Sequence, residues 1–402
     1  MVRIARWALP VAVVIAGTVT LAQQSKTLPK PFETESVRNR SRVIPRPPDA
    51  QLKVPAGFTV DVWADGFAKP RFMIEGSRGE VIVADSGSDP AAGAPPPKNG
   101  AVYIVGPGAK AAKKTLVEHL DRPYGLALWK NYLYVAEPES VKRYTYDAAA
   151  AKAGPAEEVI SLAGFGSGHW TRSLLFDRAA TKLYVGVGSA SNVDPGEDPR
   201  RAAINRYSPD GSGHETFASG TRNPIGLHWY PGTDTLWAAV QERDGLGDDL
   251  PSDYFTQIQP RAFYGWPYAY LGPNEDPRLK DKAPDLVKKT LAPDVLLGAH
   301  VAVLDFAFYS GDKFPAEYRG GAFIALHGSW NRAKRTGYSI VFQPFKNGRP
   351  AGDPKDFLSG WMISPDSADV WGRPVAVLEL RDGSLLVSDD GGNKIWRVKY
   401  GS

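Results

Sequence analysis

Two histidines lie in segments that suit a ligand-binding site. His169 is part of a glycine-rich segment, residues 164–172 (GFGSGHWTR), and His327 opens residues 327–332 (HGSWNR) directly after an apolar run. Glycines let a ligand approach the backbone closely, and histidine is the side chain that most often acts as a general base. Neither has another histidine four residues away, so a histidine-built metal site has little support. Each is a candidate for catalysis or binding, with an ordinary packed or surface histidine as the alternative.

Arg222 and Asn223 form a second candidate pair. They precede Pro224 in residues 219–226 (SGTRNPIG), just before a short apolar run. The arginine offers a planar fork of donors, and the asparagine amide offers both a donor and an acceptor. The pair therefore suits an anionic ligand that also carries a carbonyl group. The alternative is a turn in which Asn223 caps its own backbone.

Acidic side chains are concentrated in residues 241–249 (QERDGLGDD). This segment places Glu242, Asp244, Asp248 and Asp249 around two glycines. Carboxylate oxygens in a flexible loop suit Ca²⁺, although the spacing does not follow the EF-hand pattern. The segment is therefore a candidate calcium site, with a solvated acidic turn as the alternative.

The elements that must position these residues recur along the chain. Six short apolar runs start 52, 50, 53, 87 and 62 residues apart, and turn residues bound each of them. They are residues 81–84 (VIVA), 133–136 (LYVA), 183–187 (LYVGV), 236–240 (LWAAV), 323–326 (FIAL) and 385–388 (LLVS). Further apolar segments precede and follow most of them. A strand–turn–strand–loop–strand repeat of about 50 residues is typical of β-propeller blades.

The sequence therefore predicts an all-β fold, a six-bladed β-propeller with four-stranded antiparallel blades. The 41 glycines and 34 prolines would serve the many turns between strands. A pair of β-sandwiches or two separate domains is the alternative, but a linker near the middle of the chain would then be expected. We interpret residues 274–297 as an insertion between blades, and we expect residues 52–64 to close the ring beside the C-terminal blade.

The N-terminal region divides into two segments ahead of the propeller, which we place at residues 51–400. Residues 1–22 predict a signal peptide, because Arg3 and Arg6 precede sixteen uncharged, mostly apolar residues that are short for a membrane span of about 20. Residues 23–50 are polar and proline-bearing and predict an extended arm. We expect an exported protein, periplasmic or secreted, with membrane contact only if the first segment is retained.

Charge and cysteine content exclude several classes of protein. Lys and Arg number 48 against 44 Asp and Glu, and this small excess gives no support to a nucleic-acid partner. The chain contains no cysteine. Disulfide scaffolds, cysteine nucleophiles and covalently attached c-type haem are therefore impossible.

Taken in order, the motifs resemble the soluble quinoprotein glucose/sorbosone dehydrogenases. The segments that carry the resemblance are residues 168–172 (GHWTR), 222–224 (RNP), 242–249 (ERDGLGDD), 264–267 (YGWP), 372–374 (GRP) and 388–391 (SDDG). The resemblance covers nearly all of residues 52–399, and the form with HGSWNR is most similar to the sorbosone-dehydrogenase branch. It implies a six-bladed propeller, in agreement with the repeat.

The resemblance also implies cofactors and roles. The family uses pyrroloquinoline quinone (PQQ), a planar quinone with three carboxylates, together with Ca²⁺ that polarises the quinone. By motif position His169 would be the general base and Arg222 would counter charge on the reduced quinone. The cofactor contacts implied are Arg172, Arg222, Asn223, His327, Arg332 and Arg373. The backbone carbonyls of Asp244 and Gly245 would bind calcium.

Two departures bear on the substrate. Ile225 and Val375 stand where the glucose enzymes carry polar or cationic side chains. We therefore expect a sugar-derived alcohol or an aldehyde hydrate as substrate rather than glucose. Because haem attachment is impossible, the electron acceptor must be a separate quinone or cytochrome. A Ca²⁺-dependent lactonase and a non-catalytic binding propeller of the envelope are the competing functions.

Overall fold

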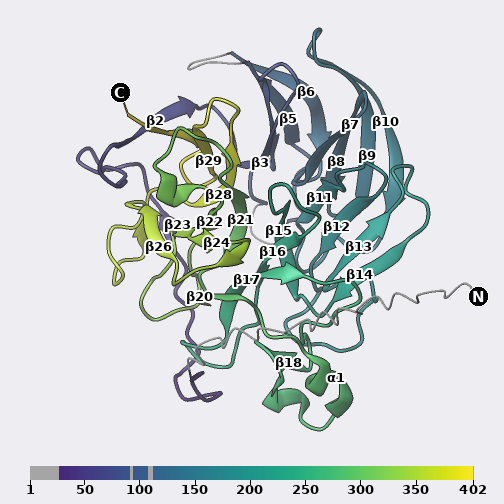
Figure 1. The fold of residues 1–402 in the computed structure, drawn as a ribbon, viewed down its shortest axis with the longest axis vertical. Helices are drawn as coiled ribbons and strands as arrows, with labels where there is room; N and C mark the ends of the chain where they lie inside the picture. Colours follow the sequence, from purple (N-terminus) through teal and green to yellow (C-terminus); the bar gives the residue numbers. More distant parts are fainter. Residues whose placement is uncertain (1–26, 91–93, 107–111, 402) are drawn as a thin grey trace, which may run out of the picture.

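The structure is a computed structural model that describes residues 27–90, 94–106 and 112–401. The predicted signal peptide lies outside these residues. Among them, helix is confined to short segments and the remainder is strand, turn and loop (Figure 1). No helix in the described part of the chain has the length and hydrophobicity of a membrane span.

Six four-stranded antiparallel sheets confirm the predicted propeller. Blade one contains β3 (Pro70–Glu75), β4 (Val81–Asp85), β5 (Gly100–Val105) and β6 (Lys113–Leu120). Blade two contains β7 (Leu126–Trp129), β8 (Tyr132–Glu137), β9 (Ser140–Asp147) and β10 (Lys152–Ser161). Blade three contains β11 (Arg172–Phe176), β12 (Leu183–Val187), β13 (Ala203–Tyr207) and β14 (Glu215–Ser219).

The second half of the chain builds the other blades. Blade four contains β15 (Asn223–Trp229), β16 (Leu236–Gln241), β17 (Ser252–Ile258) and β20 (Val295–Ala299). Blade five contains β21 (Val303–Phe308), β22 (Ala322–Leu326), β23 (Ser339–Gln343) and β26 (Lys355–Leu358). Blade six contains β28 (Pro374–Glu379), β29 (Leu385–Asp389), β30 (Lys394–Tyr400) and β2 (Phe58–Ala64). The six apolar runs are the second strands of the blades, which are buried between neighbours as expected.

Strand β2 closes the ring. It supplies the outer strand of blade six by pairing antiparallel with β30, with Phe58 opposite Tyr400 and Val62 opposite Trp396. Figure 1 shows this N-terminal strand beside the C-terminal strands of the same blade. The two ends of the propeller are therefore held together by backbone hydrogen bonds, as predicted, in a chain that has no cysteine.

The predicted insertion between blades is instead an insertion within blade four. The chain leaves β17 and forms β18 (Ala269–Tyr270), β19 (Asn274–Glu275), η1 (Pro277–Leu279) and α1 (Pro284–Lys289) before it returns as β20. Asp294 fixes the returning chain to β17 by accepting hydrogen bonds from Thr256 Oγ1 and from the Gln257 amide, both at 2.8 Å. The wide gap in the repeat therefore separates the third strand of a blade from its fourth.

The short remaining elements decorate the blades. A hairpin of β24 (Phe345–Lys346) and β25 (Arg349–Pro350) precedes β26, and η2 (Ala316–Tyr318) precedes β22. Residues 27–50 run across the ends of several blades. Within this stretch β1 (Arg42–Val43) pairs in parallel with β27 (Asp369–Val370), and the Asn39 amide donates to the Trp330 carbonyl at 2.8 Å.

The antiparallel order gathers particular loops at one end of the propeller. Where the first strand of a blade begins, its second strand ends, so the residues before the first strand lie beside the loop that follows the second. We refer to this end as the loop end. Its segments include residues 164–171 before β11, residues 188–202 after β12, residues 242–251 after β16 and residues 327–338 after β22. Candidate residues from distant parts of the sequence can therefore meet there.

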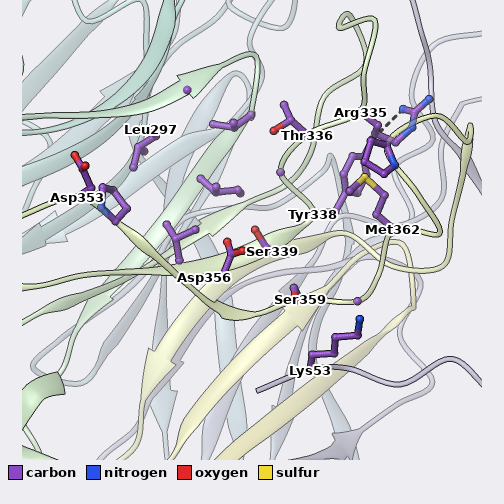
Figure 2. Close-up of a pocket in the computed structure, with 18 of the residues that line it drawn as sticks. Lys53, Leu297, Arg335, Thr336, Tyr338, Ser339, Asp353, Asp356, Ser359 and Met362 are labelled. Atoms are coloured by element: carbon purple, nitrogen blue, oxygen red, sulfur yellow. Dashed lines mark hydrogen bonds between the residues drawn. The ribbon is translucent and has the colours of Figure 1, made fainter. Parts of the chain in front are cut away.

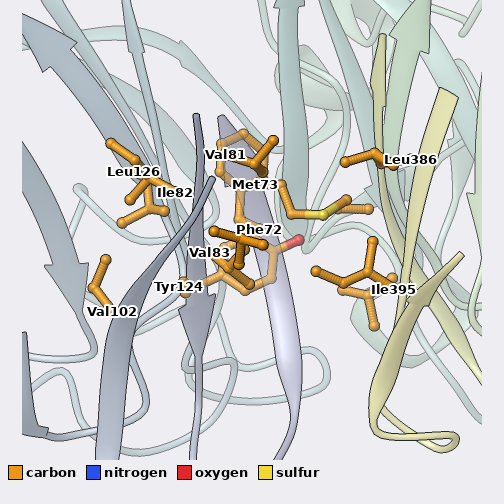
Figure 3. Packing of buried hydrophobic residues seen from close by; sticks show 14 of the residues in the cluster. Phe72, Met73, Val81, Ile82, Val83, Val102, Tyr124, Leu126, Leu386 and Ile395 are labelled. Carbon is orange, nitrogen blue, oxygen red and sulfur yellow. The ribbon is translucent and has the colours of Figure 1, made fainter. Parts of the chain in front are cut away.

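A buried apolar cluster draws residues from the first strands of several blades. The first strands contribute Phe72 and Met73 from β3, Leu126 from β7, Ile225 from β15 and Val375 from β28 to one buried cluster. Figure 3 shows several members packed between neighbouring sheets. Ile225 and Val375 are 1% and 0% exposed, so both belong to the core. Both side chains therefore serve packing.

Candidate active site at the loop end

His169 is held in one tautomer. Its Nδ1 lies 2.8 Å from the carbonyl oxygen of Ser189, so Nδ1 carries the proton and donates it. Nε2 is left with its lone pair, and no described residue hydrogen-bonds it. Burial and the positive charge of Arg222 lower the pKa of His169 to about 3. The imidazole is therefore neutral near neutral pH, with Nε2 able to accept a proton.

Arg172 holds the loop that carries His169. The prediction that it contacts a cofactor receives no support, because this side chain is fully buried. Its guanidinium donates to the carbonyls of Phe165 (2.7 Å), His169 (2.7 Å), Thr171 (2.8 Å) and Pro138 (3.1 Å). Burial lowers the pKa of Arg172 to about 9, and the four carbonyls offset the loss of hydration. Arg172 is therefore a positioning residue for the His169 loop.

Arg222 and Asn223 lie beside His169. Arg222 is 5% exposed and donates to the Glu242 carbonyl at 2.6 Å and to Asn192 Oδ1 at 3.0 Å. Asn223 Nδ2 donates to Gln241 Oε1 at 2.9 Å. The buried Oδ1 of Asn223 has no hydrogen-bond partner among the described residues. A buried acceptor without a partner is costly, so this atom is suited to receive a donor from a ligand.

Gly188 makes room between the two candidate residues. A Cβ at this position would lie 2.3 Å from Asn223 Oδ1 and 2.6 Å from the Cβ of His169. Both contacts are shorter than van der Waals packing allows, so only glycine fits without displacing one of the two side chains. Gly188 therefore permits His169 and Asn223 to face the same space.

Asp244 connects several loops at this end of the propeller. Its carboxylate accepts a hydrogen bond from Asn331 Nδ2 at 2.7 Å and lies 3.5 Å from both Arg222 Nη2 and His300 Nδ1. Its amide donates to Asn192 Oδ1 at 2.8 Å. Burial alone would raise the pKa of Asp244, but His300 and Arg222 hold it below its ordinary value. Asp244 is therefore ionised and fixes the orientation of Arg222.

The carbonyl of Asp244 does not fit its expected role as a calcium ligand. It already accepts hydrogen bonds from Asn192 Nδ2 and from Arg278 Nη1, both at 2.8 Å. A carbonyl oxygen has two lone pairs, and both are used here. Gly245 lies beside the same guanidinium, since a Cβ there would be 3.1 Å from Arg278 Nη1. Within the described residues no group of three or more acidic, histidine or cysteine side chains could hold a metal ion.

His327 and Arg373 belong to a second cluster at the loop end. His327 Nε2 lies 2.8 Å from Asp390 Oδ1, and Arg71 pairs with the other oxygen of that carboxylate. Burial and Arg373 lower the pKa of His327 to about 4, while His327 and the arginines lower the pKa of Asp390 against the effect of burial. Arg373 donates to the Gly328 carbonyl at 3.1 Å.

Trp170 connects this cluster to His169. It follows His169 in the chain, and the guanidinium carbons of Arg71 and Arg122 lie 5.2 Å and 5.5 Å from its ring centroid. Arginines over an aromatic face gain cation–π energy and keep their charge near that ring. The Nε of Arg71 is buried and has no partner in the described part of the chain. The loop end therefore presents an excess of guanidinium charge around His169.

Arg332 lies apart from both clusters. It pairs with Asp249 and lies 3.8 Å from Asp248, and it donates to the Ala299 carbonyl at 3.4 Å. The expectation that Arg332 contacts a cofactor therefore has no support from its position. The negative charges of Asp248 and Asp249 in the acidic segment are therefore neutralised by Arg332, which belongs to the neighbouring blade five.

The sequence interpretation missed the residues that join these groups. Arg71 and Asn192 belong to none of the motifs, and Trp170 and Asn331 lie within residues 168–172 and 327–332 without a role that the motifs imply. Asp390 belongs to residues 389–393 (DDGGN), whose turn-like composition concealed its pairing with His327. Only proximity in space identifies these residues.

A cavity of about 740 Å³ lies elsewhere, between blades four and five. Figure 2 shows Leu297 of blade four facing Ser339, Asp353 and Asp356 of blade five, with Lys53 nearby. None of the predicted site residues lines it. Its polar groups include Arg335, whose guanidinium is already bonded to carbonyls and to Asn39. The cavity therefore contributes nothing to the arrangement around His169.

Acidification should destabilise the protein through His169 and His327. An unfolded histidine binds a proton as the pH falls through about 6.5, whereas these two stay neutral down to about 3 and about 4. Because the unfolded state then binds more protons, the free energy of unfolding falls as the pH drops below about 6.5. We expect a loss of about 1.4 kcal/mol per histidine between about pH 7.5 and 5.5.

Urea unfolding of the wild type and of H327Q at these two pH values measures this effect. The variant should lose about 1.4 kcal/mol less than the wild type, since it lacks one of the two groups. An equal loss in both proteins would contradict the assignment of a neutral His327.

The fold and the order of the motifs place the chain in a family of six-bladed propellers. The model of the TrAA12-like family matches residues 52–252 and 276–401, and the chain belongs to this family. The resemblance inferred from the motifs is confirmed at this level, and the sorbosone branch is not distinguished. A protein of Borreliella burgdorferi, whose description is "uncharacterized", is 31% identical over 372 residues, which cover 87% of this chain and 91% of that protein.

Solved structures share the fold. A carbohydrate-active enzyme of family AA12 from Trichoderma reesei has a TM-score of 0.73 at 21% identity, over 90% of this chain and 100% of that one. The PQQ domain of a pyranose dehydrogenase from Coprinopsis cinerea, in its holo form, has a TM-score of 0.70 at 19% identity, over 88% and 98%. The soluble aldose sugar dehydrogenase of Escherichia coli, in its apo form, has a TM-score of 0.64 at 17% identity, over 85% and 99%. The insertion of blade four falls partly in residues 253–275, which the family model leaves unmatched.

Proposed function

We propose that this protein is a PQQ-dependent dehydrogenase that oxidises a hydroxyl group of a sugar, a sugar-derived alcohol or an aldehyde hydrate. The observation that carries the proposal is the neutral His169, held by Ser189 with Nε2 free, beside Arg222 and the unpartnered oxygen of Asn223. A general base must be unprotonated and within reach of the proton that it removes. His169 meets the first condition through burial and the nearby guanidinium.

The residues of the loop end fit a planar quinone with three carboxylates. Arg71, Arg222 and Arg373 supply positive charge, while Asp244 and Asp390 compensate only part of it. The free Nε of Arg71 can donate to a carboxylate or quinone oxygen. When bound, PQQ would accept the hydride, and with it the two electrons, that leave the substrate carbon.

The protein's own part in the reaction is to position and deprotonate the substrate. Nε2 of His169 takes the hydroxyl proton while Nδ1–H stays hydrogen-bonded to the Ser189 carbonyl, so the ring keeps its orientation. Arg222, fixed by Asn192 and Asp244, offers positive charge where negative charge develops. A bound anion would raise the pKa of His169 toward neutrality, which brings the base closer to its most effective range.

Export and electron transfer complete the proposal. The first 22 residues would direct the chain to the periplasm or the exterior, and a separate quinone or cytochrome would reoxidise the cofactor. The chain has no cysteine with which to bind haem covalently. A calcium-dependent lactonase is not favoured, because it would need several converging carboxylates and the described residues hold no such group.

Purified apo-protein given PQQ should reduce an artificial dye with an aldose, with sorbosone or with a related alcohol. The assay should be run with each substrate, without quinone and with quinone but no substrate. Dye reduction that needs both quinone and substrate is the expected result. Saturable quinone binding without turnover on any substrate would favour a non-catalytic binding propeller. Hydrolysis of a lactone without quinone would favour the lactonase.

A further inference from the structure

Arg278 occupies the place at which calcium is expected. Its Nη1 donates to the Asp244 carbonyl at 2.8 Å, and the second lone pair of that oxygen accepts Asn192 Nδ2. Calcium binds through carbonyl oxygens at about 2.3–2.6 Å, so it would have to displace a donor from this atom. If calcium displaced Asn192 instead, it would share the oxygen with a guanidinium, and the two positive charges would repel each other.

The guanidinium is fixed by the insertion of blade four. Asp276 caps η1 by accepting from the Arg278 amide, and its carboxylate accepts from Arg278 Nε at 2.8 Å and Nη2 at 2.7 Å. Asp276 is fully buried and is also bonded by Arg243 Nη1 at 3.1 Å. A bidentate arginine–carboxylate pair has a defined geometry, so Arg278 is aimed at the Asp244 carbonyl.

The charges around Asp276 balance only when Arg278 is present. Arg243 pairs with both Glu242 and Asp276, and Arg278 pairs with Asp276. These four side chains carry two positive and two negative charges. Loss of Arg278 would leave one negative charge next to a carbonyl with a free lone pair, which is an arrangement that attracts a divalent cation.

We propose that Arg278 takes the place of calcium at the Asp244 carbonyl, so that this protein binds its quinone with an affinity that does not depend on calcium. The inference rests on the proposed function for the identity of the quinone. The exclusion of calcium from the carbonyl rests on the hydrogen bonds alone.

Two titrations of the full chain test the proposal. In the first, PQQ is titrated into wild type, R278Q and the control K280A, each with EDTA or with saturating calcium, and tryptophan fluorescence is followed. Lys280 is an exposed residue that follows η1 in the chain. Wild type and K280A should show the same Kd in both buffers within about twofold. R278Q should bind about tenfold more weakly in EDTA and regain affinity with calcium.

In the second titration, calcium alone is added calorimetrically to the same proteins without quinone. Wild type and K280A should give no stoichiometric binding, and R278Q should gain one site. R278K provides a further test if R278Q does not fold. It keeps the positive charge but loses the bidentate pair with Asp276. Its PQQ binding should stay independent of calcium but be weaker than that of the wild type.

The outcomes separate this proposal from the proposed function. Absence of PQQ binding in every buffer would end the proposed function, while the calcium titration would still decide whether Arg278 excludes the metal. A wild-type protein that needs calcium for PQQ binding would overturn the proposal. So would a wild type that binds one calcium as tightly as R278Q.

Discussion

The variant H169Q should lose about 10²–10⁴-fold in kcat, because glutamine cannot accept the substrate proton in the transition state. Its amide can still donate to the Ser189 carbonyl, so the loop should keep its conformation. Binding of PQQ should therefore change by less than about tenfold. Dye reduction and PQQ titration on the same preparation separate the two effects.

H214Q is the matched control for this prediction. His214 lies in the turn between β13 and β14, at the end of the propeller opposite the loop end, and its Nε2 contacts Asn205. Its replacement should leave kcat unchanged. A kcat for H169Q within about tenfold of the wild type would remove His169 from the reaction.

The second large effect is on stability. R172M should lower the free energy of unfolding by about 2–4 kcal/mol, because several buried carbonyls lose their donor while the burial cost of the charge is relieved. Residues 164–171 should become more mobile, and the His169 ring should lose its fixed position. The activity of the folded fraction should therefore fall as well.

R178M is the control for R172M, since Arg178 is an exposed arginine in the turn after β11. It should change the free energy of unfolding by less than about 0.5 kcal/mol. Urea unfolding measures both variants. If R172M were as stable as R178M, the role assigned to Arg172 would be wrong.

The fold was predictable because propeller blades leave a repeated mark on the sequence. A second strand covered on both faces must be apolar throughout, and runs such as LYVGV and LLVS therefore stand out at a near-constant interval. The insertion was misplaced because β20 (VLLGA) is separated from β17 by the whole insertion, and nothing local in its sequence assigns it to blade four. Sequence periodicity thus locates the buried strands better than the outer ones.

The site was predictable only in part. Motif order brought attention to His169, Arg222, Asn223, His327 and Arg373, and the structure places all five at the loop end. Motif order implied a cofactor contact for both Arg172 and Arg222, which lie at or just before the start of a first strand. The structure separates their roles by their hydrogen bonds. Arg172 donates to four backbone carbonyls, whereas Arg222 donates to Asn192 and pairs with Asp244.

The residues that sequence reasoning missed act through contacts between distant loops. Arg71 pairs with Asp390 across 319 residues, and Arg278 reaches Asp244 across 34. No local sequence pattern predicts such a pair, because arginine and aspartate are common on protein surfaces. The three-dimensional arrangement is needed to find them.

The most direct test of the central claim is a crystal structure of the protein soaked or grown with PQQ. We expect the quinone at the loop end, within hydrogen-bond distance of Asn223 Oδ1 and Arg71 Nε, with His169 Nε2 facing its reactive ring. Arg278 should remain on the Asp244 carbonyl. A quinone bound in the cavity between blades four and five, or a quinone that leaves His169 and Asn223 untouched, would contradict the account.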